Sequence, residues 1–507
     1  MKVRQAQQAQ RTWAGPSVEH SGVSEIRGPL VVVQGVSGVG WDEFAVVRVS
    51  SATAAWDGSG SAAGSAAGST AAEGAGSAAG STAADGAGST RHGIVLEVDH
   101  DLAVVQVLEG TDGLLPKGTT VAFTGAPVRI PIGAGWLGRV CNGRGEPIDG
   151  GPPISGRSTS PVAGRPLNPI HRAPPAEPVL TGVSAIDALT TLVRGQKLPI
   201  FSAAGLPHLE LAAQLAAQST AGDEPFSVVF AAMGLTHADA DAVRDALEER
   251  LDSGELVLLL NTADDPVVER ILTPRIALTV AEHLAFDLDR HVLVVLADMT
   301  SYAEALREVS SARGELPGRR AYPGYLYSDL ATLYERCGRI HGQAGSVTVV
   351  PVLTMPAGDI THPVPDLTGY ITEGQIVLSR AVQARGVYPP VDPLASLSRL
   401  MRNGAGAGRT REGHLELAAQ LLAALAHARA IRELAEIVGA AALNATDQMY
   451  LRFETEFERR LVNQGREELR EFDETLARCW DVVRVLPRRE LTMIPQALLD
   501  AHPENGG

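Results

Sequence analysis

The chain has 507 residues, of which 45% are hydrophobic, and it carries a formal net charge of −16 at pH 7. This length predicts about three domains, and the apolar fraction is large enough to fill sizeable cores. The negative charge argues against nucleic acid as a partner, because proteins that bind phosphate backbones show a basic face.

The cysteines and the apolar runs indicate the compartment. Cys141, Cys337 and Cys479 lie too far apart in the sequence for ligand-type spacing, and three cysteines are too few for a disulfide framework. The opening residues MKVRQAQQAQRTWAG lack the apolar core of a signal peptide, and no run reaches the roughly 18 apolar residues of a membrane span. We therefore expect a protein of the reducing cytoplasm, for which any work at a membrane needs a separate anchor.

The N-terminal region predicts a small antiparallel β-barrel. Residues 1–22 are polar and are expected to be disordered. From Val23 onward the sequence consists of short β-like runs separated by glycine: GPLVVVQGV, EFAVVRV, HGIVLEVDHDLAVVQVLEG and GTTVAFTG. This pattern predicts a barrel over residues 23–125.

A low-complexity insert interrupts the barrel at about residues 57–89. It consists almost wholly of Gly, Ala and Ser, and it contains AAGSTAAEGAGS followed at once by AAGSTAADGAGS, a tandem copy that differs only at Glu73 and Asp85. Such a composition cannot bury enough apolar area to offset the entropy of the chain. We expect a flexible hairpin loop that the fold tolerates at its surface.

The central region, residues 126–390, predicts a doubly wound α/β domain. Its first part, up to Pro178, is rich in Pro and Gly and is typical of a long connection that wraps a surface. Near-continuous apolar runs then alternate with helical patterns; these runs are FSVVFAAM, ELVLLLN, HVLVVLADM and SVTVVPVL. Such runs indicate strands of a parallel sheet covered on both faces, and ligands of such a sheet lie beyond the carboxyl ends of its strands.

Two helices between these strands have recognisable ends. The segment THADADAVRDALEERLDSG predicts a helix that begins with a capping box of Thr236 and Asp239. Its apolar residues share one face: Val243, Leu247 and Leu251. A second helix is expected to begin at Asp265 and to kink at Pro274. After Val391 the strand patterns end, and residues 391–507 predict an α-helical C-terminal domain.

The stretch LPIFSAAGLPHLEL, residues 198–211, has the layout of a phosphate-binding loop. A working loop, G-x-x-x-x-G-K-[ST], needs backbone N–H groups around the phosphates, a Lys on the β/γ oxygens and a hydroxyl on Mg²⁺. With Gly205 as the second glycine, the first-glycine, Lys and hydroxyl positions hold Ile200, Leu206 and Pro207. The N-terminus of a helix alone contributes only about 0.3–1 kcal/mol toward an anion at an exposed site.

Two interpretations of this stretch follow. It is either the core of a nucleotide hydrolase that has lost its hydrolysis site, or a βα turn that never bound phosphate, which the stretch taken alone favours. The candidate nucleotide-binding residues of this degenerate loop are Ser202, Gly205, Leu206, Pro207 and, from the end of HVLVVLAD, Asp298. Asp298 occupies a Walker B position, where it would hold the metal or its water, but it equally fits the N-cap of the helix TSYAEALREV.

Three arginines and the histidines complete the candidates. Arg319 and Arg320 lie in a long Pro/Gly loop after the Asp298 strand, either as solvated charges or at a boundary between two subunits. Arg399, in DPLASLSRLM, is either an ion-paired surface residue or an arginine finger for a neighbouring chain. The 13 histidines form no close cluster in the sequence, so nothing supports a metal other than Mg²⁺.

Several long stretches of the chain closely resemble one family. They are GVSAIDALTTLVRGQKLPIFSAAGLPH, the run from ADDPVVERILTPR through GELPGRRAYPGYLYSDLATLYERCGRI, THPVPDLTGYITEGQI and YPPVDPLASLSRLM. The family is the B subunit of V-type and archaeal-type rotary ATPases and ATP synthases. The resemblance spans nearly the whole chain except the insert and the ends.

The resemblance implies an N-terminal β-barrel, a central RecA-like α/β domain and a C-terminal helical domain. It also implies three such chains alternating with three catalytic A subunits in a hexameric ring, with central rotor stalk and peripheral stalk subunits as further partners. The family's B subunits are non-catalytic and regulatory. Arg399 matches the arginine that reaches the nucleotide site of the catalytic A subunit, where ATP or ADP binds with Mg²⁺.

The sequence agrees with a non-catalytic role and departs from the family in one respect. Catalytic relatives carry a Gly-Glu-Arg loop where this chain has Gly234, Leu235 and Thr236, so the glutamate that activates water is absent. Where B subunits commonly have SGSGLP, this chain has SAAGLP, in which Ala203 adds a Cβ and Ala204 lacks a hydroxyl. We therefore expect weak or no nucleotide binding by this chain itself.

Two other classes of protein compete with a subunit of a proton- or sodium-translocating complex on the cytoplasmic side of the cell membrane. A homohexameric secretion-type ATPase shares the fold but needs an intact Lys-[ST] pair. A ring-shaped RNA translocase needs a basic, aromatic-studded barrel. The sequence offers neither feature.

Deletion of Ser59 to Ser89 should leave thermal stability and assembly almost unchanged, because the closure free energy of a flexible loop changes by only about 0.6 kcal/mol per doubling of its length. Differential scanning calorimetry and native mass spectrometry of the deletion variant check this. A deletion that blocks assembly would show that the insert is a contact surface.

Overall fold

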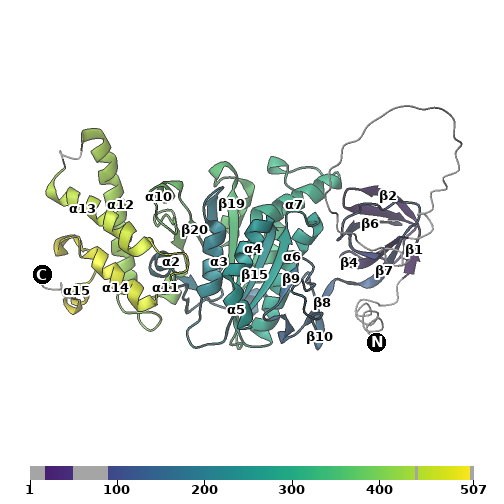
Figure 1. The fold of residues 1–507 in the computed structure, drawn as a ribbon, viewed down its shortest axis with the longest axis horizontal. Coiled ribbons are helices and arrows are strands. Elements are labelled where there is room, and N and C mark those ends of the chain that lie inside the picture. Colours follow the sequence, from purple (N-terminus) through teal and green to yellow (C-terminus); the bar gives the residue numbers. More distant parts are fainter. Residues whose placement is uncertain (1–17, 50–89, 440–442, 503–507) are drawn as a thin grey trace, which may run out of the picture. The chain divides into compact units, whose positions relative to one another are not determined.

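The computed structural model describes residues 18–49, 90–439 and 443–502. The chain forms two compact units, Met1–Val128 and Arg129–Gly507 (Figure 1). The insert at 57–89 and most of the N-terminal stretch expected to be disordered, up to residue 17, lie outside the described residues.

The first unit is a curled antiparallel sheet. Its strands are β1 (Val18–His20), β2 (Val23–Arg27), β3 (Leu30–Gln34), β4 (Glu43–Val49), β5 (Thr90–Asp99), β6 (Leu102–Val107) and β7 (Thr119–Pro127). They lie in the order β1-β7-β4-β5-β6-β3-β2, and irregular registers in the β2/β3, β4/β7 and β5/β6 pairs mark bulges. Bulges bend a strand and increase its twist, which curls a sheet of this size.

The alternation of apolar residues that predicts these strands also forms the core of the unit. Val31, Val33, Val105 and Val121 are fully buried inside it. One expectation needs correction, because β1 already begins at Val18, inside the stretch 1–22 expected to be disordered. Its three residues pair antiparallel with β7, so that β1 forms an edge of the sheet, and a strand this short shows no periodicity in the sequence. The strands on either side of the insert, β4 and β5, are direct antiparallel partners.

The second unit contains a ten-stranded sheet. Its main path, in spatial order, is β21 (Leu397–Ser398), β20 (Gly374–Val377), β14 (Ile200–Ala203), β19 (Ser346–Met355), β17 (His291–Ala297), β15 (Phe226–Leu235), β16 (Leu256–Thr262) and β9 (Val140–Asn142). Neighbours along this path are parallel, except that β21 runs antiparallel to β20. Off the path lie β18 (Gly338–Ile340), antiparallel to β19, and β11 (Arg172–Ala173), antiparallel to β18.

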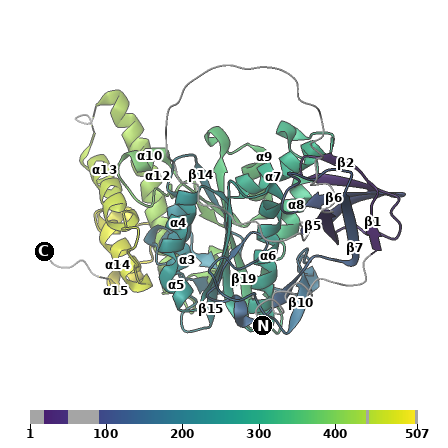
Figure 2. The same ribbon diagram turned by 45° about the vertical axis from the view of Figure 1, so that its right-hand side comes forward.

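The near-continuous apolar runs become strands that are buried on both faces. Every residue of β17 is buried, and so is all of β15 except Gly234. Two groups of helices cover the sheet (Figure 2): α3 (His208–Gln218) packs on α4 (His237–Ala246), and α6 (Val267–Phe286) packs on α7 (Met299–Ala312) and α8 (Leu326–Tyr334). Both groups contact strands of the sheet, as a parallel sheet requires.

Local signals set the ends of these helices. Thr236 caps α4, since its hydroxyl oxygen accepts from the Asp239 N–H at 3.2 Å. In a capping box the Asp239 carboxylate would accept the backbone N–H of Thr236. Here it accepts the Thr236 hydroxyl instead, at 2.7 Å. The predicted single helix over 236–254 is divided at Leu247, where α5 (Glu248–Asp252) begins. Helix α6 continues through Pro274.

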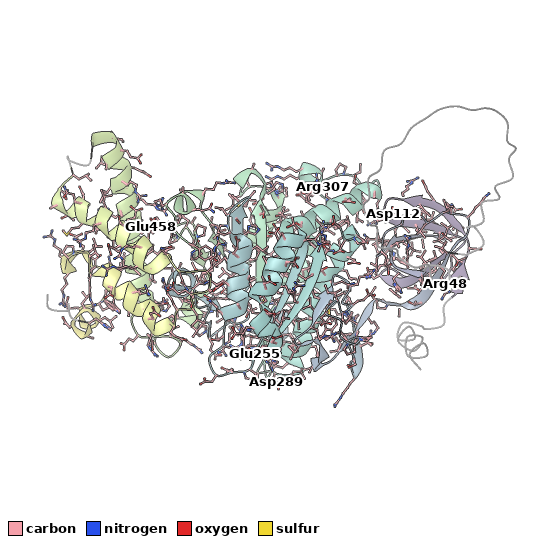
Figure 3. All side chains as sticks on the ribbon, viewed as in Figure 1. Arg48, Asp112, Glu255, Asp289, Arg307 and Glu458 are labelled. Carbon is pink, nitrogen blue, oxygen red and sulfur yellow. The ribbon has the colours of Figure 1, made fainter. Side chains whose placement is uncertain are left out.

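The C-terminal helices belong to the same compact unit as the sheet. They are α12 (His414–Val438), α13 (Ala445–Phe457), α14 (Phe472–Val483) and α15 (Gln496–Ala501). Helix α2 (Ser184–Leu189) joins their apolar core, and its buried polar groups bind them: Ser184 Oγ lies 2.9 Å from Thr475 Oγ1. Figure 3 labels Glu458, the partner of Arg385 in a further ion pair between the two regions.

The remaining short elements are β8 (Arg129–Ile132), β10 (Ser158–Pro161), β12 (Pro178–Val179), β13 (Leu192–Val193), α9 (Pro363–Ile371), α10 (Arg380–Ala384) and α11 (Met401–Gly404). The 3₁₀ turns are η3 (Ala134–Trp136), η4 (Pro169–His171), η5 (Arg319–Ala321), η6 (Pro356–Gly358) and η9 (Arg488–Glu490), and η8 (Glu458–Val462) is a π-helical turn.

Gly345→Ala should destabilise the second unit by an amount at the upper end of the about 1–3 kcal/mol that overpacking costs. A Cβ at Gly345 would lie 1.9 Å from the carbonyl oxygen of Ala285, on the backbone of α6, which cannot move aside as a side chain can. The control is Gly342→Ala, where nothing lies within 4 Å of the new Cβ and only the positive φ opposes it, at about 1–2 kcal/mol. Equal melting temperatures for the two variants would contradict this packing.

Candidate functional site

The degenerate loop lies at the carboxyl end of β14, in the middle of the parallel sheet. β14 pairs with β19 on one side and β20 on the other, and the chain turns at Gly205, with φ +82°, into α3. This is the position at which a doubly wound sheet binds its ligands.

Three successive positions of the loop, residues 206–208, offer no free backbone donor. The Leu206 N–H donates to the Ala203 carbonyl at 3.2 Å, and the His208 N–H donates to the Leu206 carbonyl at 2.8 Å. Between them, Pro207 has no N–H to offer. A phosphate cradle depends on successive free N–H groups, and these three positions provide none.

The side chains at the candidate positions do not replace those donors. Leu206, at the Lys position, is 4% exposed and packs in the main apolar core. Ser202 lies inside β14, fully buried, and its hydroxyl donates to the Ala203 carbonyl at 3.0 Å. The residues of this loop therefore do not fit a magnesium-bound triphosphate.

Asp298 at the end of β17 is occupied by protein donors. Its Oδ1 accepts the Thr300 N–H at 2.7 Å, which is the N-cap bond of α7. Its carboxylate also accepts the Thr354 N–H, and its Oδ2 accepts the Thr354 hydroxyl at 2.5 Å. Of the two roles considered for Asp298, the structure describes the N-cap, extended by a bond to the neighbouring strand β19.

A groove of about 1470 Å³ opens beside the loop, and its lining is strongly acidic. Gly205, Leu206, Pro207 and Asp298 line it, whereas Ser202 does not. The lining includes eight carboxylate side chains, among them Glu255 (Figure 3), and two arginines. One of the two, Arg250, donates hydrogen bonds to carbonyl oxygens at the end of α3, and burial lowers its pKa. This charge opposes a polyphosphate ligand.

Sequence reasoning missed one cation at the loop. Arg380, exposed in the first turn of α10, donates from Nη2 to the Ala204 carbonyl at 2.6 Å. It reaches the loop from 176 positions away, so no local motif marks it.

The segment that corresponds to the Gly-Glu-Arg loop of catalytic relatives is structural in this chain. The Gly234 N–H donates to Asn261 Oδ1 at 3.1 Å, and Leu235 is buried. Thr236 is committed to the cap of α4. None of the three offers a base for a water molecule.

Arg319 and Arg320 are paired within the chain. Arg319 Nη1 lies 3.0 Å from Asp366 Oδ2, and Arg320 Nη2 lies 2.8 Å from Asp359 Oδ2. Both pairs are largely exposed, where an ion pair contributes only about 0–1 kcal/mol.

Arg399 is exposed and, unlike Arg319 and Arg320, has no carboxylate partner in the described part of the chain. Exposure alternates from Ser396 to Arg399, so that Ser396 and Ser398 face inward while Leu397 and Arg399 face outward. Within the described part of the chain, no hydrogen bond or ion pair engages the Arg399 guanidinium. Its backbone N–H donates to the Glu373 carbonyl at 3.0 Å, which fixes its place before the start of β20.

Arg399 and the degenerate loop lie at opposite ends of the sheet. Glu373 precedes β20 and bonds to Lys197, which precedes β14, whereas the loop follows Ala203 at the far end of the parallel strand β14. The six steps along the chain from Lys197 to Ala203 span roughly 20 Å at about 3.3 Å per residue. The guanidinium therefore cannot serve the loop of its own chain.

Two further features concern metal ions and membranes. Among the residues that the structure describes, no group of three or more His, Cys, Asp or Glu side chains is placed to hold a metal ion. In the same part of the chain, every helix is too short or too polar to cross a bilayer.

Comparisons with known proteins give the family. A model of the nucleotide-binding domain of the ATP synthase alpha/beta family matches residues 182–398, and a model of the beta-barrel domain of that family matches residues 77–125. A model of the C-terminal domain of V and A type ATP synthase matches residues 403–503. The chain is also 50% identical over 489 residues to the B subunit of the A-type ATP synthase of Aeropyrum pernix, covering 96% of this chain and 98% of the relative.

The chain belongs to the B subunits of V/A-type ATP synthases. A solved structure of similar fold is described as a unique ATP synthase subunit NeqB from Nanoarcheaum equitans. It has a TM-score of 0.65 and 37% sequence identity, and the match covers 78% of this chain and 93% of that one. These findings confirm the predicted fold: an N-terminal antiparallel β-barrel, a central RecA-like α/β domain with a degenerate P-loop, and a C-terminal helical domain. The boundaries at 125/126 and 390/391 stay predictions.

The isolated chain should show no ATPase turnover above background. The Lys, the Mg²⁺ hydroxyl and the glutamate are absent, and the N–H groups of Leu206 and His208 are occupied. A coupled-enzyme assay on the purified chain, with Asp298→Ala as the control for contaminants, checks this. Turnover that disappears in Asp298→Ala would contradict it, because that turnover would belong to this chain.

Proposed function

We propose that this chain is a non-catalytic, regulatory subunit that alternates with three catalytic A subunits in a hexameric ring and completes their nucleotide sites. The observation that carries the proposal is the position of Arg399, exposed and without a partner in the described chain, at the end of the sheet opposite the degenerate loop.

The opposite placement of these two features suits a head-to-tail ring. Such an assembly repeats a heterologous contact, in which one end of a subunit meets the other end of the next. Each copy of this chain then presents Arg399 to the loop end of a neighbouring catalytic subunit. In the same ring, the other catalytic neighbour would lie against the degenerate loop of this chain.

The chemistry of a guanidinium fits this role. It holds two phosphate oxygens in a fixed fork and matches the charge that spreads over the γ-phosphoryl group in the transition state. ATP or ADP with Mg²⁺ would be held mainly by the catalytic subunit. The contribution of this chain is one oriented cation, since its own loop does not fit the nucleotide.

The remaining partners follow from membership of the complex. We infer contacts with the central rotor stalk and the peripheral stalk, and coupling of ATP synthesis or hydrolysis to proton or sodium transport. The relative from Aeropyrum pernix is named as a subunit of an A-type ATP synthase, which supports a place in a membrane-associated complex. The ring would lie on the cytoplasmic side of the cell membrane, with ion transport carried by other subunits.

The alternative of a self-sufficient, homohexameric secretion-type ATPase has less support. It requires a hydrolysis site in every chain, and this chain has a buried Leu206 and Pro207 at the Lys and hydroxyl positions. Half of its residues are identical to those of the B subunit of an A-type ATP synthase over nearly its whole length.

Arg399→Ala should lower ATP hydrolysis by a reconstituted ring by about 10³–10⁵-fold, the usual contribution of an arginine finger. At about 1.36 kcal/mol per decade this corresponds to roughly 4–7 kcal/mol, far above the about 0–1 kcal/mol of a surface ion pair. Arg399→Lys should recover only part of the rate, because it keeps the charge and loses the fork. The measurement is steady-state hydrolysis by the purified ring.

Assembly and melting temperature of the Arg399→Ala ring should stay near those of the wild type. The matched control is Arg319→Ala, which removes an exposed cation that already has a carboxylate partner. Arg399→Ala rings that assemble normally and hydrolyse ATP within about threefold of wild type, a loss below about 1 kcal/mol, would show that Arg399 is not a finger.

A further inference from the structure

The backbone that carries Arg399 is held by a buried polar network. Gln196, fully buried before β14, donates from Nε2 to the Ser398 hydroxyl at 2.9 Å and to the Glu373 carbonyl at 3.2 Å. Its Oε1 accepts the Val193 N–H at 3.0 Å. The amide of Gln196 thus bonds both to Ser398, which precedes Arg399, and to Glu373, whose carbonyl accepts the Arg399 N–H.

A buried ion pair fixes the other side of the same point. Lys197 Nζ, with its side chain 5% exposed, lies 2.8 Å from Glu373 Oε1, and the Lys197 N–H donates to Glu373 Oε2 at 2.8 Å. The Glu373 N–H returns a bond to the Lys197 carbonyl at 3.0 Å. Glu373 therefore joins β14 through its carboxylate and its N–H, and joins Arg399 through its carbonyl.

Lys197 keeps its positive charge in this environment. Burial acts to lower the pKa of Lys197, but its surroundings, which include the carboxylates of Glu373 and Glu335, raise the pKa overall. Glu335 Oε1 supplies a second contact to Nζ at 2.9 Å. Removing one carboxylate would leave a buried cation with half of its partners, and an incompletely paired buried charge is costly.

Close packing leaves the segment little freedom to shift. Gly374 pairs with Ser398, and its φ of +137° is one that residues with a Cβ rarely adopt. A Cβ there would lie 2.1 Å from the Leu397 carbonyl oxygen. The backbone under Arg399 is thus fixed by hydrogen bonds, by an ion pair and by contact with the neighbouring strand.

We infer that Gln196 and the Lys197–Glu373 pair position Arg399 for the nucleotide site of the neighbouring subunit. These residues do not touch the nucleotide, and they act through the backbone of Ser398 and Arg399. The inference rests on the proposed role of Arg399. A finger acts only when its fork meets the transferring phosphoryl group, and a displacement of about 1 Å can cost about 10²-fold in rate.

The test is a double-mutant cycle in the reconstituted ring. Glu373→Gln keeps the size of the side chain and the backbone bonds but removes the charge that faces Lys197. We expect its kcat for ATP hydrolysis to fall by about 10- to 100-fold. KM for MgATP should change by less than about threefold, because the interaction lost is one that forms in the transition state.

The decisive comparison is Glu373→Gln in the Arg399→Ala background. If Glu373 acts through Arg399, the second substitution should lower kcat by less than about twofold once the finger is gone, because residues that act as a unit are not additive. Equal losses in both backgrounds would overturn the inference, and so would a Glu373→Gln ring of wild-type kcat. If Arg399→Ala alone has no effect, the finger proposal and this inference both fail.

Two further variants separate positioning from general stability. Gln196→Met has a similar length and removes the amide donors, so it should repeat the kcat loss and the lack of additivity without touching the ion pair. Glu282→Gln is the matched control, because it removes the charged partner of the fully buried Arg336. The Glu282 side chain is 23% exposed, close to the 28% of Glu373, and it contacts neither Arg399 nor Glu373. This variant should lower the melting temperature and leave kcat near wild type. A kcat loss in Glu282→Gln equal to that in Glu373→Gln would show that both act only through stability.

Discussion

The parallel direction of β14 and β20 is the constraint on which the rest of the structure depends. Strands that run the same way give a sheet two chemically different ends. The strands begin at one of them, the entry end, and finish at the other, the exit end. In this chain the entry end holds Lys197, Glu373 and Arg399, and the exit end holds the degenerate loop. A subunit with two different ends is suited to a ring in which each member meets a different face of each neighbour.

At the exit end, the groups that would hold a nucleotide hold the protein itself. Asp298 joins the cap of α7 to the end of β19, and Leu206 fills the core. The hydrogen bonds to Asp298 satisfy a buried carboxylate that would otherwise be costly to leave unpaired. The absence of a working nucleotide loop is therefore compatible with the fold, because Asp298 and its donors satisfy each other.

The segment that carries Arg399 also connects the sheet to the helical region. At its start, Asp392 Oδ1 lies 2.8 Å from Arg429 Nη2 on α12. At its end, Ser398 bonds to Gln196, and the Ser398 hydroxyl donates to the Thr191 carbonyl. Helix α2 contributes to the same helical core, where burial raises the pKa of Asp187 to about 6 against the hydrogen bonds from Thr181 and Gly182. The sheet, the segment that carries Arg399 and the C-terminal helices thus share one continuous framework.

The sequence alone determined the long apolar strands, the apolar face of the helix after Thr236 and the absence of the catalytic side chains, because these depend on short-range pattern and on which residue occupies each position. It could not decide between the two roles of Asp298, and it gave no sign that the N–H groups of Leu206 and His208 are occupied. Nor did it mark the pairing of Lys197 with Glu373, which lie 176 positions apart. Only the tertiary structure places Arg399 at the end of the sheet opposite the loop, because strand order and direction are set by the packing of the whole sheet and leave no local trace in the sequence.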